Sequence, residues 1–283
     1  MKDATSKKHQ LNNIEQVVKL AVKHKGMWFR GHSEISEELT PRIFRKEYSD
    51  IHGEEVEFFF TEEFRRRAPT ISTELPKRKD YLSWLVLMQH YECPTRLLDW
   101  TENILIALFF VVSDKTGHDG ELWAMDPYEL NKVHESDNLY GIATIDNKYV
   151  EYLAEQPIYR FEDRFQNKLK EKYDMHPPKY PVAFQSPMAF ERMNSQSSAF
   201  TIHPRPQNGC TIPKKMDDAD LIRYIIPSKN KKKMKEVLYL LGIRRQTVFQ
   251  DLESLSQDLK YDASLRYTKE LPNNKPSNFV PYL

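Results

Sequence analysis

The chain has 283 residues, which is enough to bury a sizeable core in one large domain or two small ones, and we expect one domain with additions. Its 42 basic and 41 acidic residues give a net charge of +1, so the overall charge demands neither a nucleic acid nor an anionic membrane as partner. Cys93 and Cys210 lie far apart and match no ligand spacing, which argues against structural zinc and against a disulfide framework. The N-terminus lacks the apolar core of a signal peptide, and the longest apolar run, residues 104–112, is about half a membrane span. We therefore expect a soluble cytoplasmic protein.

Helices and strands follow one another without a regular repeat in the first half of the chain. Asn12 or Asn13 can cap a helix whose apolar residues recur at helical spacing, and Gly26 can end it. The other expected helices cover residues 54–67, residues 81–91 and a nearly all-apolar segment that begins at Glu102 or Asn103. The expected strands cover residues 27–30 and 121–125. Because the last of these helices is apolar all round, we expect it at the centre of the fold.

The second half adds three expected strands, at residues 180–186, 199–203 and 221–226. A lysine run at residues 229–235 opens a helix that covers residues 234–241, and residues 229–283 are expected to form a helical extension. Residues 135–180 have the least regular pattern and could form an insertion or a lid. The absence of regular βαβ spacing favours an α+β fold. We predict a single domain over residues 1–283, with a small mixed or antiparallel sheet flanked by helices.

A dense cluster of polar side chains runs directly into the apolar helix. Its members are His90, Tyr91, Thr95, Arg96, Asp99, Trp100 and Thr101. Burying such groups without partners costs free energy, so they must satisfy one another, contact a ligand, or both. Upstream, Arg30 lies inside an aromatic run at residues 28–31. These features indicate a site more clearly than they indicate a reaction.

The same segments resemble the FRG domain family, which is named for its Phe-Arg-Gly motif. The resemblance is strongest over residues 26–112 and is weaker over residues 191–204. The segments that carry it are WFRG at 28–31, QHY at 89–91, PTRLLDWT at 94–101 and ALFF at 107–110. The family often has glycine after Tyr91 and near Ser198, whereas this chain has Glu92 and Ser198 there.

The order of these motifs is also similar to that of ADP-ribosyltransferases, which implies a fold like theirs. In those enzymes a strand arginine holds the phosphates of NAD, a hydroxyl residue shapes the nicotinamide pocket, and a late carboxylate supports the cationic sugar. The resemblance would give these roles to Arg30, to Thr101, and to Glu191 or Gln196. NAD would then be the substrate, and no metal would be required. Such a protein would act on a macromolecule, as a bacterial toxin or in phage defence.

Most candidates also have a structural interpretation. Arg30 could bind a pyrophosphate with its bidentate guanidinium, or it could form an ion pair with Asp99. His90 could act as an acid, a base or a phosphate donor, or it could bond a backbone carbonyl at a helix end. Arg96 is close enough in sequence to Asp99 for the two to pair. Tyr91 and Trp100 could stack on a nicotinamide or a base, or belong to the core.

The remaining candidates lie in residues 191–204, and several common catalytic motifs are absent from the sequence. Glu191 could be catalytic or an ordinary surface carboxylate, and His203 is expected to be a satisfied turn histidine. The sequence contains no GxGxxG, P-loop, HExxH, CxxC or GxSxG motif. The catalytic candidates are thus Arg30, His90, Thr101 and Glu191. The candidates for holding the nucleotide are Arg30, Tyr91, Arg96, Asp99, Trp100 and Gln196.

Two alternatives belong to other functional classes. A nucleic-acid-binding module would use the basic runs at residues 65–67, 77–79 and 229–235, and it would need them on one face of the molecule. A non-catalytic sensor would use the polar cluster only to build the fold, so that removing Arg30 or Asp99 would destabilise the protein. Whether the chain is an enzyme stays open at this point.

Overall fold

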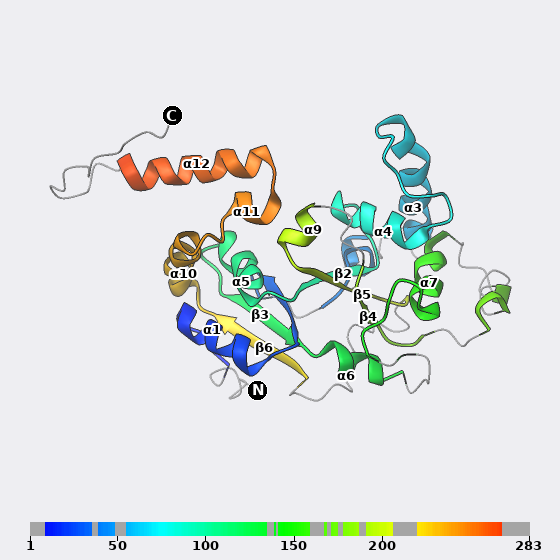
Figure 1. Cartoon of the computed structure of the whole chain (residues 1–283), viewed down its shortest axis with the longest axis horizontal. Helices are drawn as coiled ribbons and strands as arrows, with labels where there is room; N and C mark the ends of the chain where they lie inside the picture. The colour runs from blue at the N-terminus through cyan, green and yellow to red at the C-terminus, as the bar shows by residue number, and fades with distance from the viewer. Residues whose placement is uncertain are drawn as a thin grey trace.

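A computed structural model describes residues 9–35, 39–48, 55–134, 139, 141–158, 167–168, 171–174, 178–186, 191–205 and 220–267. Its centre is one six-stranded sheet in the order β4-β5-β2-β1-β3-β6, and every neighbouring pair of strands is antiparallel. The strands are β1 (Trp28–His32), β2 (Leu97–Thr101), β3 (Gly120–Met125), β4 (Val182–Phe184), β5 (Ser198–Ile202) and β6 (Leu221–Ile226). The predicted α+β fold with an antiparallel sheet is confirmed (Figure 1).

The four helices expected in the first half of the chain are present, as α1 (Ile14–Lys23), α3 (Glu55–Arg67), α4 (Tyr81–His90) and α5 (Ile104–Ser113). The other α-helices of the described residues are α6 (Pro127–Lys132), α7 (Lys148–Glu155), α9 (Glu191–Ser195), α10 (Ser228–Leu240), α11 (Arg245–Phe249) and α12 (Leu252–Tyr267). Asn13 caps α1 and Asn103 caps α5, because each side-chain oxygen accepts a bond from a backbone N–H of the first turn. The helix expected at residues 234–241 begins earlier, at Ser228, so the lysine run lies inside α10.

One strand departs from the sequence prediction. β2 lies within the polar cluster and was not predicted as a strand. Asp99 is its one exposed residue, and the other four are buried. Strand side chains point alternately to the two faces of a sheet, so Asp99 and Thr101 share one face and Trp100 lies on the other. Four of the five residues of β2 are buried, so the strand shows no alternation of polar and apolar residues in the sequence.

Two core clusters lie side by side on one face of the sheet. The first joins α5 to β1, β3 and β6, with α1 and α10 packed behind α5. The second joins α4 and α7 to β2, β4 and β5. Val150, Tyr152 and Leu153 of α7 are fully or almost fully buried in it, so part of the segment expected to be an insertion or lid belongs to the core. A third cluster, around Trp28 and Trp100, covers the opposite face.

Two of the five described non-glycine residues with positive φ lie close to the places where the family often has glycine. Glu92 has φ of 59° and follows α4, while Ser197 has φ of 46° and immediately precedes β5. A non-glycine residue in this region carries a modest backbone cost. Glu92 is held by a hydrogen bond from its N–H to the Gln89 carbonyl, 3.0 Å long.

Gly31 is the closest contact between β1 and α5. A methyl group at this position would overlap the carbonyl oxygen of Ala107 and lie 2.9 Å from Cγ2 of Val111. Its φ is not in the left-handed region, so the reason for glycine is space and not backbone conformation.

Substituting Gly31→Ala should therefore lower the free energy of unfolding by about 1–3 kcal/mol, because the backbone of α5 would have to move. Gly117→Ala is the matched control, since no atom lies within 4 Å of its added methyl group. Urea denaturation of both variants checks the prediction. Equal midpoints would show that α5 adjusts to the methyl group without cost.

Candidate functional site

A pocket of about 320 Å³ lies at the seam between the two core clusters. It is lined by residues of β1, β2, β5, α4, α5 and α9, together with two arginines that follow β1. The lining residues used below are Arg30, Arg42, Arg45, Gln89, His90, Glu92, Asp99, Trp100, Thr101, Ile106, Phe110, Met193, Gln196 and Phe200. This volume is at the lower end of the range that small-molecule sites usually have.

The pocket lies where β1 and β2 separate. β1 pairs with β3 over five residues, but it pairs with β2 at a single position, Phe29 opposite Thr101. Past this position the two strands no longer share a ladder, and Arg30 and Asp99 face each other across the opening. The separation thus exposes polar groups of two central strands that would otherwise be covered by sheet hydrogen bonds.

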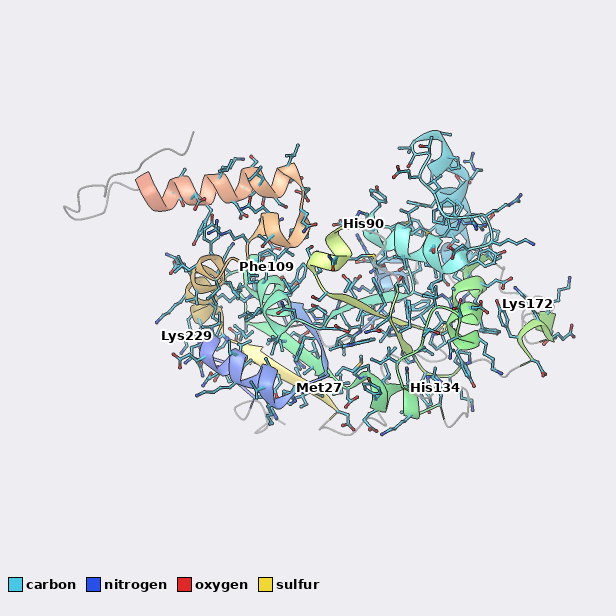
Figure 2. All side chains as sticks on the ribbon, in the orientation of Figure 1. Met27, His90, Phe109, His134, Lys172 and Lys229 are labelled. Atoms are coloured by element: carbon cyan, nitrogen blue, oxygen red, sulfur yellow. The ribbon has the colours of Figure 1, made fainter. Side chains whose placement is uncertain are left out.

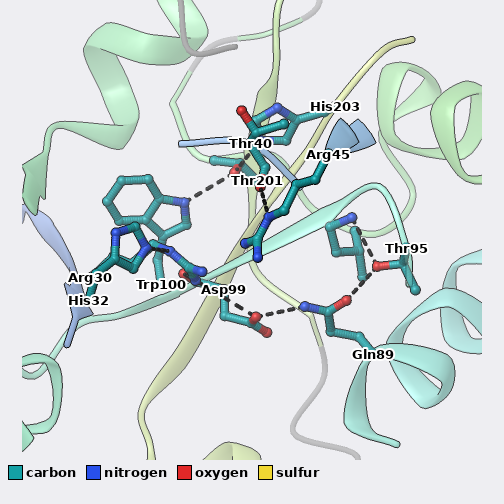
Figure 3. Close-up of polar contacts among 11 residues, drawn as sticks. Arg30, His32, Thr40, Arg45, Gln89, Thr95, Asp99, Trp100, Thr201 and His203 are labelled. Carbon is teal, nitrogen blue, oxygen red and sulfur yellow. Dashed lines mark hydrogen bonds and ion pairs between the residues drawn. The ribbon is translucent and has the colours of Figure 1, made fainter. Parts of the chain in front are cut away.

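Arg30 is held in this opening by two hydrogen bonds. Its Nη1 donates to the carbonyl oxygen of Asp99 at 2.6 Å, and its Nε donates to Nε2 of His32 at 2.8 Å (Figure 3). The Asp99 carboxylate is 3.8 Å from Nη1, and the side chain of Asp99 is 52% exposed, against 16% for Arg30. Burial lowers the pKa of Arg30, while Asp99 opposes this shift. An exposed carboxylate at this distance makes a weak ion pair.

Asp99 is connected to the end of α4 through side-chain amide and hydroxyl groups. Oδ2 of Asp99 accepts from Nε2 of Gln89 at 2.6 Å, and Oε1 of Gln89 accepts from the Thr95 hydroxyl at 2.5 Å. Thr95 in turn accepts from the backbone N–H of Leu97. The polar cluster is therefore partly self-satisfied, and Figure 3 shows this chain of contacts running along one side of the opening.

Arg96 does not pair with Asp99. It is fully buried, and it forms a two-pronged contact with Glu57 of α3, with Nε to Oε1 at 2.7 Å and Nη2 to Oε2 at 2.5 Å. Its Nη1 donates to Oε1 of Gln156 at 2.5 Å. Arg96 is not among the residues that line the pocket. This placement gives it a structural contact that ties α3 to the start of β2.

Trp100 and His203 belong to a second buried chain of contacts. The indole N–H of Trp100 donates to the hydroxyl of Thr201 at 3.1 Å, and this hydroxyl is 2.9 Å from Nε2 of His203. Burial, with smaller contributions from Arg96 and Arg30, lowers the pKa of His203 to about 3. His203 is therefore neutral and satisfied, as the sequence predicts. Trp100 has one edge on the pocket but is 3% exposed.

Thr101 lines the pocket, but its hydroxyl already has two partners. It donates to the carbonyl oxygen of Gln196 at 2.6 Å and accepts from the N–H of Asn103 at 3.0 Å. The Gln196 side chain donates to the carbonyl oxygen of Val248 at 3.2 Å. These bonds join β2, α11 and the segment after α9. They account for Thr101 without a ligand.

His90 and Gln196 reach the pocket, whereas Tyr91 does not line it. Figure 2 shows His90 at the end of α4. Its ring contacts that of Tyr91 edge to face, with the two ring centroids 4.9 Å apart. Tyr91 is 66% exposed. Glu191 begins α9, but its side chain lies outside the described residues. Met193 of the same helix is a lining residue.

Arg42 and Arg45 are site residues that the sequence did not reveal. Arg42 begins a short 3-10 helix, Arg42–Phe44, and donates through Nη1 to the carbonyl oxygen of Glu92 at 3.1 Å. Arg45 donates through Nε to the carbonyl oxygen of Thr40 at 3.2 Å, and its charge contributes to the lowered pKa of Arg30. A single 3-10 turn is too short to show a periodic pattern in the sequence, so no periodicity marks the two arginines. The Phe-Arg-Gly motif immediately upstream is the only local signal of a nearby site.

Two of the basic runs lie well apart. Figure 1 shows α3 and α10 on different sides of the sheet, and Lys229 marks the α10 side in Figure 2. Arg65, Arg66 and Arg67 also have carboxylate partners on α3 itself, namely Glu62 and Glu63. A continuous basic face built from these runs stays a prediction.

Two further findings concern the described residues alone. No group of three or more histidine, cysteine, aspartate or glutamate side chains gathers there in a way that could hold a metal ion. None of the helices found in this part of the chain has the length and apolar character that crossing a membrane requires.

The pair of Arg96 and Glu57 generates a stability prediction. Burial by itself would raise the pKa of Glu57, but Arg96 and Arg205 outweigh it and lower the pKa below its ordinary value of 4.5. Glu57→Gln should cost about 3–5 kcal/mol, because it leaves a buried guanidinium without its counter-charge. Glu63→Gln, also on α3 but paired with exposed Arg66, should cost less than about 1 kcal/mol. Urea denaturation at pH 7 measures both.

His203 generates a pH prediction. Its folded pKa of about 3 lies below the ordinary value of 6.5, so between these values the unfolded chain binds a proton that the native protein excludes. Stability should therefore fall as the pH falls below 6.5, by about 2 kcal/mol between pH 7.5 and pH 5 for this group. His203→Gln should show a smaller loss over that interval, with all other histidines unchanged. Parallel slopes in the two proteins would contradict the assignment.

Comparison with known proteins supports one family. Residues 25–120 match the model of the FRG domain, in agreement with the resemblance expected over residues 26–112. Searches of curated proteins and of solved structures found no significant match. The resemblance to ADP-ribosyltransferases thus receives no support from these comparisons. The matched segment runs from just before β1 to the start of β3, and it therefore includes Arg30, Arg42, Arg45, His90, Asp99 and Thr101 of the pocket.

Proposed function

We propose that the pocket binds an anionic small molecule that carries phosphate groups, of the nucleotide class. The observation that supports this proposal is the convergence of Arg30, Arg42 and Arg45 on one pocket. The lining carboxylates are those of Asp99 and Glu92, so the lining residues carry a net positive charge of 3 − 2 = +1 before His90 is counted. Guanidinium groups suit phosphate because they present several donors in a planar fork.

The arginines keep donors available for a ligand. Arg30 uses Nε and Nη1 in bonds to His32 and Asp99, and Arg45 uses Nε in its bond to Thr40. Within the described part of the chain, Nη2 of Arg30 and both terminal nitrogens of Arg45 have no hydrogen-bond partner. Because Arg30 is anchored on two sides, its remaining donor is directed before any ligand arrives, which reduces the entropic cost of binding.

The pocket also has an apolar part, which we call the apolar wall. It consists of Ile106 and Phe110 of α5, Met193 of α9 and Phe200 of β5. A flat ring system can bury its surface on such a wall while its phosphates contact the arginines. A volume of about 320 Å³ suits a mononucleotide or one half of a dinucleotide.

NAD is the member of this class to test first, because of the sequence resemblance to ADP-ribosyltransferases. In that reaction Arg30 would neutralise pyrophosphate charge, and nicotinamide would leave as the acceptor attacks the ribose. The candidates for assisting charge at the sugar are His90 and Glu191. The hydroxyl of Thr101, which is engaged with Gln196 and Asn103, would shape the wall without acting as an acid or base. Transfer to a macromolecule in a toxin or in phage defence stays a prediction of the resemblance.

Arg45→Ala tests the binding proposal. Calorimetric titration at low salt with NAD, ADP and AMP should give binding to at least one probe, and the variant should bind it about 10-fold to 100-fold more weakly, because a charged hydrogen bond contributes about 1.5–3 kcal/mol. Nicotinamide release, measured with a cell lysate as acceptor, separates turnover of NAD from binding alone.

Arg66→Ala is the matched control, because it removes an exposed arginine on α3 far from the pocket. It should leave the affinity within about twofold, and thermal melting establishes that each variant is folded. The proposal is wrong if no probe binds the wild-type protein at low salt, or if the two variants lose affinity equally. Equal loss would indicate a general effect of net charge.

A further inference from the structure

Behind Arg30, a chain of charged and polar side chains crosses three strands. Nε of Arg30 donates to Nε2 of His32 at 2.8 Å, and Nδ1 of His32 is 2.7 Å from Oε1 of Glu121. Oε2 of Glu121 is in turn 2.8 Å from Nε of Arg223. His32 and Glu121 are directly opposite in the register of β1 and β3, and Arg223 lies on the adjacent strand β6. The side chain of Glu121 is fully buried.

These contacts determine where the proton of His32 lies. A guanidinium can only donate hydrogen bonds, so Nε2 of His32 must accept from Arg30. A carboxylate can only accept, so Nδ1 must donate to Glu121. Only the neutral imidazole with its proton on Nδ1 satisfies both neighbours. His32 does not line the pocket, so it can influence a ligand there only through Arg30.

Some of the charges around His32 lower its pKa and others raise it. Arg30 on β1 and Arg45 after β1 disfavour its protonation, whereas Glu121 on β3 favours it. Burial is the largest effect, and the sum lowers the pKa of His32 below its ordinary value of 6.5. The imidazole is therefore neutral at pH 7 to 8. The proton arrives only in more acidic solution.

We infer that His32 is a positioning residue, whose neutral imidazole holds Arg30 toward the anion and whose protonation releases it. This inference rests on the proposed anion-binding function of the pocket. When Nε2 gains a proton it becomes a donor that faces the Nε–H of Arg30, so their hydrogen bond is lost and the guanidinium must turn away. The hydrogen bond that positions Arg30, the arginine of the Phe-Arg-Gly motif, is therefore lost in acid.

The test compares wild type with His32→Gln across pH 5 to 8. A glutamine can accept from Arg30 through its oxygen and donate to Glu121 through its nitrogen, but it does not titrate in this range. The probe is NAD, whose pyrophosphate has no terminal monoester group with an ionisation near pH 6. Its affinity for wild type should fall about tenfold as the pH falls from 7.5 to 5, whereas its affinity for the variant should not fall. His90 is present in both proteins, and its protonation would strengthen anion binding, which is the opposite sign.

A second measurement does not depend on any ligand. Nitrogen-15 NMR of the histidine side chains should show His32 as the Nδ1-protonated tautomer at pH 8, with a pKa below 6.5. If NAD and the other nucleotides fail to bind wild type at pH 8, the proposed function fails, while this spectrum still decides whether His32 holds Arg30 as inferred. A proton on Nε2 at pH 8 would overturn the inference. Identical pH dependence of binding in wild type and in folded His32→Gln would overturn it as well.

Discussion

The contact between Gly31 and the backbone of α5 is the constraint on which the site depends. β2 leads into α5 through a turn of two residues, and α5 then lies directly against β1 at Gly31. This packing brings the apolar helix onto the central strands while β1 and β2 share a single paired position. The opening that results holds Arg30. A glycine beside Arg30 is thus required by space, since a side chain there would separate the strand from its helix.

Arg30 and Arg96 both lie in the motif segments of the sequence, but they have different surroundings in the fold. Arg96 is fully buried, and its guanidinium is saturated by Glu57 and Gln156, so it stabilises the contact between α3 and β2. Arg30 is anchored by a backbone carbonyl and a neutral histidine, neither of which cancels its charge. Its ion pair with Asp99 is long and partly exposed. A cation that is positioned but not neutralised is the kind that a protein can offer to an anionic ligand.

The pocket combines this cation with an apolar wall, and the two come from different parts of the core. The arginines follow β1, whereas the wall is built by α5, α9 and β5. The family match covers the arginine side and all of α5, but not α9 and β5. The later part of the chain therefore adds Met193 and Phe200 to a wall that begins on α5.

Local patterns in the sequence determined the individual helices and most strands. Asn13, Asp80 and Asn103 accept bonds from the first turns of α1, α4 and α5, and a cap acts over only three residues, so it can be recognised without the fold. β2 was missed because four of its five residues are buried, so it shows no alternation of polar and apolar residues. The sequence predicted that members of the polar cluster satisfy one another, contact a ligand, or both, and Asp99 and Thr95 are indeed joined through Gln89.

The tertiary structure alone decided which partners these side chains have. Arg96 pairs with Glu57, 39 residues away, and not with nearby Asp99, because side chains three positions apart along an extended segment point to opposite sides of the sheet. Arg42 and Arg45 lie in and just after a single 3-10 turn and reach the pocket only through the path of the chain after β1. The register of β1 and β3 places Glu121 opposite His32, on the side away from Arg30. Sequence patterns encode short-range hydrogen bonds, whereas the pairing of buried charges depends on which strands become neighbours.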